Sequence, residues 1–198
     1  MRVGLVCLTA LLVAGCSTST GITKPADVNG SMSSSVSTNV TSQPQVSSTL
    51  TEPHPPPNHW NDGTSYDPCL TYTADQIRSW GADPAKVEDR GVEDRQVRGC
   101  RWVADGWSVG LTVANTKVSS YLDSTLFGNP RSIKVAGLDA VIFQGGSVGA
   151  PVCTVSLPVQ NASVGVVVVV FDPKHSSISD PCAKATEVAT AVAPTLPK

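Results

Sequence analysis

The sequence predicts an α+β fold: an antiparallel β-sheet of about 5–6 strands, with a helix near the start and a helix at the C-terminus of the domain. Three observations lead to this fold class. Short apolar runs separated by glycine turns predict hairpins. Helix-start signals appear before and after these runs. Charged residues make up 15% and aromatic residues 5% of the chain, which is typical of a β-rich exported domain rather than a helical bundle.

The first helix is predicted from a capping box at Thr73-Ala74-Asp75-Gln76. In such a box the Thr73 hydroxyl accepts a hydrogen bond from an otherwise unpaired amide, and Gln76 reaches back to the start of the helix. The helix is expected to end near Trp80, because Gly81 can adopt the left-handed conformation of a helix cap. The charged residues that follow, 83–98, are interpreted as a loop.

The central part of the chain predicts the strands. They are expected at 100–103, 107–113, 132–135, 140–144, 152–158 and 164–171, with a short helical or irregular piece at 119–127. The last of these strands is apolar at nearly every position, so we expect it to lie inside a sheet that is covered on both sides.

The C-terminal helix is predicted to begin at Asp180-Pro181-Cys182. Asp180 can cap the helix and Pro181 suits its first turn. The segment 183–193 is rich in helix formers and places its small apolar residues on one face, which can pack on the sheet.

The first sixteen residues, MRVGLVCLTALLVAGC, resemble a bacterial lipoprotein signal peptide. Arg2 is a short positive region, and the apolar run after it is too short to span a bilayer. The Val13-Ala14-Gly15-Cys16 segment looks like a lipobox, which implies thioether lipidation of Cys16, cleavage before it and acylation of the new amine. The alternative is an ordinary signal peptide with a chance cysteine.

The composition divides the chain into three parts. Residues 1–15 are the expected signal peptide, 16–65 a lipidated cysteine followed by a linker, and 66–198 a folded domain. The linker is rich in Ser, Thr and Pro, so we expect it to be disordered and to hold the domain away from the lipid headgroups. His54 and His59 flank three prolines in it and are interpreted as solvated rather than metal-binding.

The net charge and the cysteines indicate which classes of partner, ligand and cross-link to expect. The net charge is −2 and no basic stripe is present, so we expect no nucleic-acid partner. Four cysteines remain after Cys7 leaves with the signal and Cys16 takes the lipid, and an even number in an oxidising compartment indicates two disulfides. No CxxC pair or Cys/His spacing points to zinc, and we expect neither a metal nor a cofactor.

Several short motifs recur in a defined order. Asp67-Pro68-Cys69 recurs as Asp180-Pro181-Cys182, and between them lie 99–102 (GCRW), 135–140 (VAGLDA) and 153–155 (CTV). Together these motifs resemble a family of actinobacterial cell-envelope lipoproteins that carry a domain of unknown function, of which the mycobacterial Lpr-type lipoproteins are examples. The resemblance covers about 67–196. It sharpens the expected fold and location and implies no biochemical activity.

Within this resemblance we expect Cys69 to pair with Cys100, and Cys153 with Cys182. Each bond would join one helix start to one strand and close a loop of about thirty residues, for roughly 3–4 kcal/mol of stabilisation in the chain-entropy model. Spacing alone does not fix the connectivity, because four cysteines allow three pairings.

Three segments resemble functional motifs. Residues 106–110 (GWSVG) match the G-x-S-x-G elbow of serine hydrolases, with His175 as the only later histidine. The preferred interpretation is a hairpin, because a strand rather than a helix is expected to follow. Residues 145–149 (GGSVG) lack the Lys-[Ser/Thr] of a phosphate loop and are interpreted as a turn. Trp102 and Trp107 could form a binding face, but more often such residues cover a core.

These observations predict a lipid-anchored lipoprotein on the extracytoplasmic face of the cell membrane, in contact with the bilayer through Cys16. We expect it to be a binding or accessory module for another envelope component and not an enzyme. A carrier or sensor of a small apolar ligand is the alternative, and a serine hydrolase is the third hypothesis. The identity of a partner and the oligomeric state do not follow from the sequence.

Overall fold

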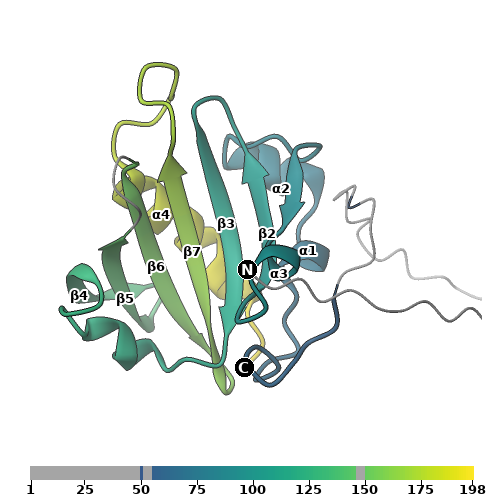
Figure 1. The fold of residues 1–198 in the computed structure, drawn as a ribbon, viewed down its shortest axis with the longest axis vertical. Coiled ribbons are helices and arrows are strands. Elements are labelled where there is room, and N and C mark those ends of the chain that lie inside the picture. The colour runs from purple at the N-terminus through teal and green to yellow at the C-terminus, as the bar shows by residue number, and fades with distance from the viewer. Residues whose placement is uncertain (1–49, 51–54, 146–149) are drawn as a thin grey trace, which may run out of the picture. The chain divides into compact units, whose positions relative to one another are not determined.

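A computed structural model describes residues 50, 55–145 and 150–198 (Figure 1). Its centre is one antiparallel sheet of seven strands in the order β1-β2-β3-β7-β6-β5-β4. The strands are β1 (Val87–Asp89), β2 (Arg98–Val103), β3 (Trp107–Ala114), β4 (Gly128–Val135), β5 (Leu138–Gly145), β6 (Val152–Val159) and β7 (Ala162–Val170). The sheet thus has one strand more than the five to six expected, and β7 lies at its middle.

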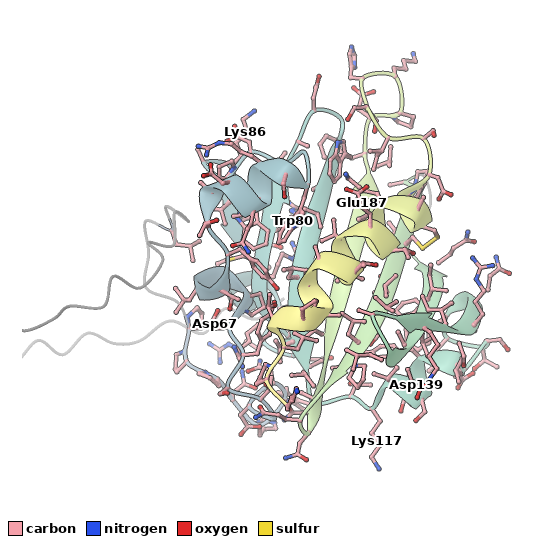
Figure 2. All side chains as sticks on the ribbon, turned by 180° about the vertical axis from the view of Figure 1, so that it is seen from behind. Asp67, Trp80, Lys86, Lys117, Asp139 and Glu187 are labelled. Carbon is pink, nitrogen blue, oxygen red and sulfur yellow. A yellow bond between two sulfur atoms is a disulfide. The ribbon has the colours of Figure 1, made fainter. Side chains whose placement is uncertain are left out.

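Short helices surround the sheet. They are α1 (Pro68–Thr71), α2 (Ala74–Ser79), α3 (Arg90–Glu93), α4 (Pro181–Val192) and the 3-10 helices η1 (Val118–Leu122) and η2 (Ala193–Thr195). Figure 2 shows α2 and α4 in front of the sheet on the same face, with α4 crossing the central strands. The predicted C-terminal helix is therefore present, and the capping box of α2 forms as expected, with Thr73 and Gln76 bonding reciprocally.

The hydrophobic core lies between the sheet and the helices α2 and α4. Alternate residues of β7, from Val164 to Val170, face it and are buried, as are their partners on β3 and β6. From α4 come the buried side chains Ala185, Val188, Ala189 and Val192, which is the apolar face predicted from the sequence. Trp80 packs edge-on against Trp102 at the α2 end of this core.

The additional strand lies in the segment that we expected to be a loop, 83–98. Val87–Asp89 pairs with β2, with Val87 opposite Trp102, and α3 follows immediately. Three residues with two carboxylates show no apolar alternation, which explains why sequence periodicity misses this strand. Charged, very short edge strands are also a common way to prevent edge-to-edge aggregation.

Buried contacts with the sheet are also made before residue 66, the predicted start of the folded domain. Asn61 and Thr64 are buried, and the Arg98 guanidinium donates hydrogen bonds to the main-chain oxygens of both. A polar segment can therefore be ordered by a buried cation from a distant strand. The expected signal peptide, Cys16 and the linker residues 17–49 and 51–54 lie outside the described residues.

The search for membrane spans covered only the described residues, and none of their helices is both long and apolar enough to cross a bilayer.

Candidate functional site

The face of the sheet opposite α2 and α4, which we call the open face, contradicts one expectation. The apolar strand β7 was expected to be covered on both sides, but Gly165, Val167 and Val169 on this face are only half-buried. On its other face, Val166 and Val168 are completely buried. The alternation of β7 is thus valine facing the core and small or apolar residues facing outward. An apolar surface left partly accessible at the centre of a sheet is a candidate binding surface.

Small residues form the middle of the open face. Gly110 on β3 lies opposite Val167 on β7, which lies opposite Thr154 on β6. In the next row, Thr112 lies opposite Gly165. These side chains are shorter than the arginines and aromatic rings at the two borders of the open face.

The two borders of the open face differ in chemistry. On the β2 side, α3 and the residues after it lie over the sheet (Figure 1), and the Asp89 carboxylate caps α3 by accepting from the Gly91 amide. On the β5 side, Tyr121 stacks on Phe143 with their ring centroids 5.2 Å apart. Phe127 packs against Phe143 at 4.7 Å. The short side chains at the centre of the open face are therefore bordered by charged groups on the β2 side and by aromatic rings on the β5 side.

A pocket of about 120 Å³ lies where the charged border meets the sheet. We call it the Arg101 pocket. Its floor and apolar walls come from β3, β7 and the segment before β2, and two arginines line its remaining side. The lining residues are Arg90, Val97, Arg101, Gly110, Thr112, Val167 and Val169.

Both arginines of the pocket are ion-paired to a glutamate. Arg101 pairs with Glu88 on β1, and Arg90 pairs with Glu93 within α3. The Glu88 carboxylate accepts a hydrogen bond from Nη2 of Arg101. Arg101 Nε, in contrast, is buried without a hydrogen-bond partner among the described residues. A buried unsatisfied donor costs about 1–3 kcal/mol, so such groups call for an explanation in a folded protein.

Gly110 accounts for the open space of the pocket. A Cβ built on Gly110 would meet its nearest heavy atoms at 3.8–3.9 Å, which is ordinary contact. Neither backbone strain nor a close neighbour therefore requires glycine here. Glycine inside a strand weakens it and often marks a place where a ligand or another backbone approaches closely.

The serine-hydrolase motif does not assemble a catalytic pair. Ser108 lies within β3 rather than on a strand-to-helix turn, and its hydroxyl is buried with no hydrogen-bond partner in the described part of the chain. His175 is exposed and pairs with Asp172, with Nδ1 and Oδ2 2.6 Å apart. This contact raises the pKa of His175 and lowers that of Asp172. The nucleophile and base of the motif are thus not hydrogen-bonded to each other.

The two tryptophans considered as a binding face belong to the core. Trp102 and Trp107 are buried. The Trp107 indole donates to the Ser177 hydroxyl at 3.2 Å, and the Lys184 ammonium lies 5.6 Å from the centre of its ring. The glycine-rich segment 145–149 lies almost entirely outside the described residues, apart from Gly145 at the end of β5.

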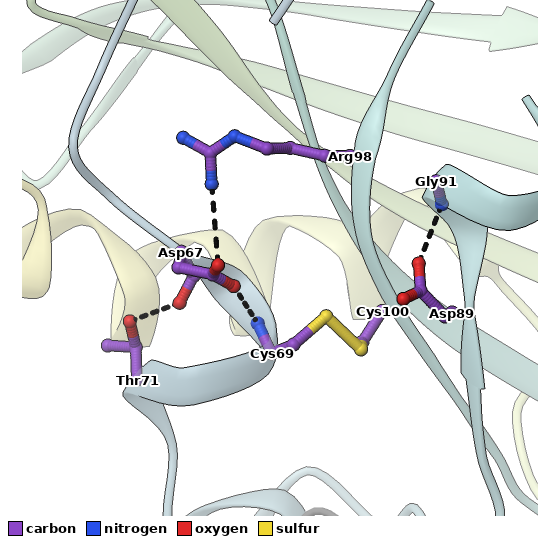
Figure 3. The surroundings of a disulfide bond; sticks show 7 residues. All are labelled: Asp67, Cys69, Thr71, Asp89, Gly91, Arg98 and Cys100. Atoms are coloured by element: carbon purple, nitrogen blue, oxygen red, sulfur yellow. Dashed lines mark hydrogen bonds and ion pairs between the residues drawn. A yellow bond between two sulfur atoms is a disulfide. The ribbon is translucent and has the colours of Figure 1, made fainter. Parts of the chain in front are cut away.

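The four cysteines form two disulfides with the expected pairing, Cys69–Cys100 and Cys153–Cys182. Figure 3 shows the first of them beside Asp67, whose carboxylate accepts from the Cys69 amide at 2.9 Å and faces the Arg98 guanidinium. Burial lowers the pKa of Arg98, and the charge of Asp67 opposes this shift. The disulfide and the contact with Arg98 thus attach the start of α1 to β2.

A second buried polar chain joins the N-terminal helices to the C-terminus. The hydroxyls of Tyr66 and Tyr72 are 2.7 Å apart, and that of Tyr72 is 2.8 Å from the Thr195 hydroxyl. Burial raises the pKa of both tyrosines. These groups are satisfied by one another and are therefore structural. Within the described residues, no group of three or more His, Cys, Asp or Glu side chains is arranged to hold a metal ion.

Sequence reasoning missed the Arg101 pocket, because strand pairing brings Val167 and Val169 of β7 beside lining residues from 90–112. One signal was available: Gly110 and Gly165 interrupt apolar strands at interior positions. Such glycines predict a bulge or a close backbone approach. The pairing of β3 with β7 then places both on the open face.

Comparison with known proteins identifies a family without an activity. No curated protein matches the chain, and no solved structure does. A family model described as "Protein of unknown function (DUF3558)" matches residues 11–195, which is most of the chain. The chain therefore belongs to the DUF3558 family of proteins of unknown function.

Proposed function

We propose that this protein is a lipid-anchored cell-envelope lipoprotein of the actinobacterial Lpr type, and that its domain is a non-catalytic binding module. In this proposal an acyl group on Cys16 holds the chain at the extracytoplasmic face of the membrane, and the linker after it presents the domain. The lipobox-like segment 13–16 and the hydroxyl-rich composition of the linker support the anchor.

One observation carries the binding function: helices cover the core face of the central sheet, while the apolar open face stays partly accessible and contains a pocket. Val92 on α3 is 66% exposed and Leu126 beside the aromatic border is 73% exposed. These exposed apolar residues extend the partly accessible apolar surface of the open face, and large exposed apolar patches mark sites that bind another macromolecule. The partner in this proposal is another protein of the envelope.

The anchor is tested by growing cells with an alkyne-labelled palmitate analogue and comparing the native chain with Cys16→Ala. We expect label and membrane retention for the native protein and neither for the variant. Cys7→Ala is the matched control, because its cysteine lies in the same apolar segment but outside the lipobox. Label on the Cys16→Ala variant would contradict the anchor.

The binding surface is tested by photo-crosslinking in intact cells. A benzophenone amino acid is placed at Val92, on the border of the open face, or at Glu187, an exposed residue of α4 on the opposite face (Figure 2). We expect a discrete crosslinked protein from position 92 and not from position 187. Equal products from both positions would contradict a specific open-face site.

A second function, carriage of a small apolar ligand, is favoured by a hollow of about 400 Å³ near the C-terminus. Its lining includes Leu138, Val159, Pro194 and Leu196. Lipid extraction of the protein purified from its native membrane, followed by mass spectrometry, tests this function. A stoichiometric apolar molecule that is lost in Leu138→Asp would support the carrier, and its absence would favour the protein partner.

A further inference from the structure

We propose that the Arg101 pocket receives one aliphatic side chain from an extended, locally uncharged segment of a partner protein, and that unpaired nitrogens of Arg101 donate to the main-chain carbonyls beside that side chain. This inference rests on the proposed binding function and specifies its chemistry. It follows from the volume, the charge balance and the floor of the pocket.

The volume fits one branched aliphatic side chain. The pocket measures about 120 Å³, and one water occupies about 30 Å³ of liquid. The space therefore corresponds to roughly four methyl or methylene groups, which is the size of a Val, Leu or Ile side chain. Its walls include Val97, Val167 and Val169, so an apolar group would replace poorly hydrogen-bonded water there.

The charge balance favours a neutral occupant. Two guanidinium groups line the pocket, and each is already paired with a carboxylate, from Glu88 or Glu93. An anionic ligand would compete with these carboxylates for the arginines, and a cation would compete with the arginines for the carboxylates. A neutral hydrogen-bond acceptor would not compete with either member of these ion pairs.

Arg101 supplies the polar complement. Its guanidinium has five donors, and Glu88 is its only hydrogen-bonded partner among the described residues. Peptide carbonyls are neutral acceptors that accompany every side chain of an extended segment. Donation to them would use guanidinium hydrogens that have no acceptor among the described residues.

The floor suits a backbone that lies close to the sheet. Gly110 and Gly165 occupy neighbouring rows of β3 and β7 on the open face, and neither presents a side chain to an approaching main chain. Beyond the pocket, the exposed Val92 extends the apolar contact along α3. One side chain of the partner segment would thus enter the pocket, and the main chain beside it would lie along the sheet. Binding hot spots commonly combine one buried side chain with surrounding contacts that contribute less energy.

The test measures peptide binding to the full chain in detergent micelles by NMR, following the amides of Gly110 and Val167. The probes are the blocked, uncharged tripeptide acetyl-Ala-Leu-Ala-N-methylamide and its Ala-Ala-Ala counterpart. We expect the leucine probe to bind roughly 10- to 50-fold more tightly, because about three more carbons are buried. The same leucine peptide with a free carboxylate should bind less tightly than the blocked form.

Two kinds of variant assign the binding to the pocket. Gly110→Val fills it and should abolish the preference for leucine, and Gly110→Ala, which places one methyl group in ordinary contact, should reduce it in part. Thr154→Val is the matched control, since it adds no volume to the pocket and lies on the same face. Arg101→Gln should weaken the leucine probe about 3- to 10-fold, whereas Arg78→Gln on α2 should have no effect.

Three results would overturn the inference. Equal affinity for the leucine and alanine probes would exclude an aliphatic anchor. Tighter binding of the free carboxylate would show an anion site instead. Binding that appears only after deletion of residues 17–49 would make this chain's own linker the occupant. A crosslinked protein at position 92 combined with any of these results would retain the binding function and reject only the pocket chemistry.

Discussion

The tripeptide Asp-Pro-Cys occurs twice in this chain, and the two copies begin helices in the same way. The Asp67 carboxylate accepts a hydrogen bond from the Cys69 amide at 2.9 Å, and the Asp180 carboxylate accepts one from the Cys182 amide at 2.8 Å. In both, proline occupies the first turn, where its missing N–H is not needed. Both cysteines then form a disulfide with a strand of the sheet.

The surroundings of the two copies differ. Cys69 and Cys100 are completely buried, and the Arg98 side chain beside Asp67 is only 5% exposed. Cys182, in contrast, is half-buried and lines hollows at the surface. The comparison teaches that three residues suffice to set a helix start, while the energetic weight of that start depends on what the rest of the fold places around it.

The largest expected effect is on the two disulfides. They close similar loops, with sequence separations of 31 and 29 residues, so chain entropy assigns about 3–4 kcal/mol to each. Replacing Cys69 and Cys100 together by Ala should cost about 1–2 kcal/mol more than replacing Cys153 and Cys182, because both cysteines of the first pair are completely buried, whereas only Cys153 of the second pair is. The free energies of unfolding in urea measure the difference.

The same pair of variants can contradict this comparison. If both double variants lose equal stability, burial adds nothing to the N-terminal disulfide and loop closure explains both. Native-state reduction provides an independent measurement: a soluble dithiol followed by alkylation should label Cys182 first, since the buried sulfurs react only after local opening.

The next effect concerns Arg98, which has no counterpart at the second helix start. Arg98→Met retains much of the side-chain volume but leaves the carbonyls of Asn61 and Thr64 without their donor, so we expect a loss of about 2–4 kcal/mol. Hydrogen exchange should also rise in residues 58–66. Arg78→Met is the control, because Arg78 forms only an exposed ion pair and should change stability by less than about 0.5 kcal/mol.

These two regions also show how far sequence reasoning reaches. The start of α4 and the strands expected between 100 and 171 follow from local sequence patterns, whereas the helix start at Asp67 and the disulfide pairing were expected from the family resemblance. Arg98 looks like one more charge in a polar segment, and nothing nearby shows that it is buried against residues 58–65. The Arg101 pocket is missed for the same reason, because strand pairing and not sequence neighbourhood brings Val97 and Val167 together.

A smaller effect separates the two capping carboxylates. Asn is as good a helix cap as Asp, so Asp67→Asn and Asp180→Asn both retain the cap and remove only the charge. At Asp67 the change also removes the partner of the buried Arg98 guanidinium, 3.7 Å away, and we expect a loss of about 1–2 kcal/mol. At Asp180 the loss should stay within about 0.5 kcal/mol. Similar losses in thermal unfolding would show that the ion pair with Arg98 is not what distinguishes the two sites.

The smallest effect is a titration in the loop that precedes Asp180. The hydrogen bond that His175 donates to the Asp172 carboxylate raises the pKa of His175 above its ordinary value of 6.5. A raised pKa in the folded state means that protonated His175 stabilises this loop. The contribution is complete below the unfolded pKa, near 6.5, and is lost as the pH rises through the higher folded value. Following the His175 ring protons by NMR against pH should show the raised pKa directly.

Two substitutions identify the cause of this shift. Asp172→Asn should return the His175 pKa toward 6.5, since it removes the charge that favours the imidazolium. Asp105 acts on His175 only through its more distant charge, so Asp105→Asn should lower the pKa by much less. If both variants shift the pKa equally, the general negative field of the loop is responsible and the 2.6 Å contact with Asp172 is not.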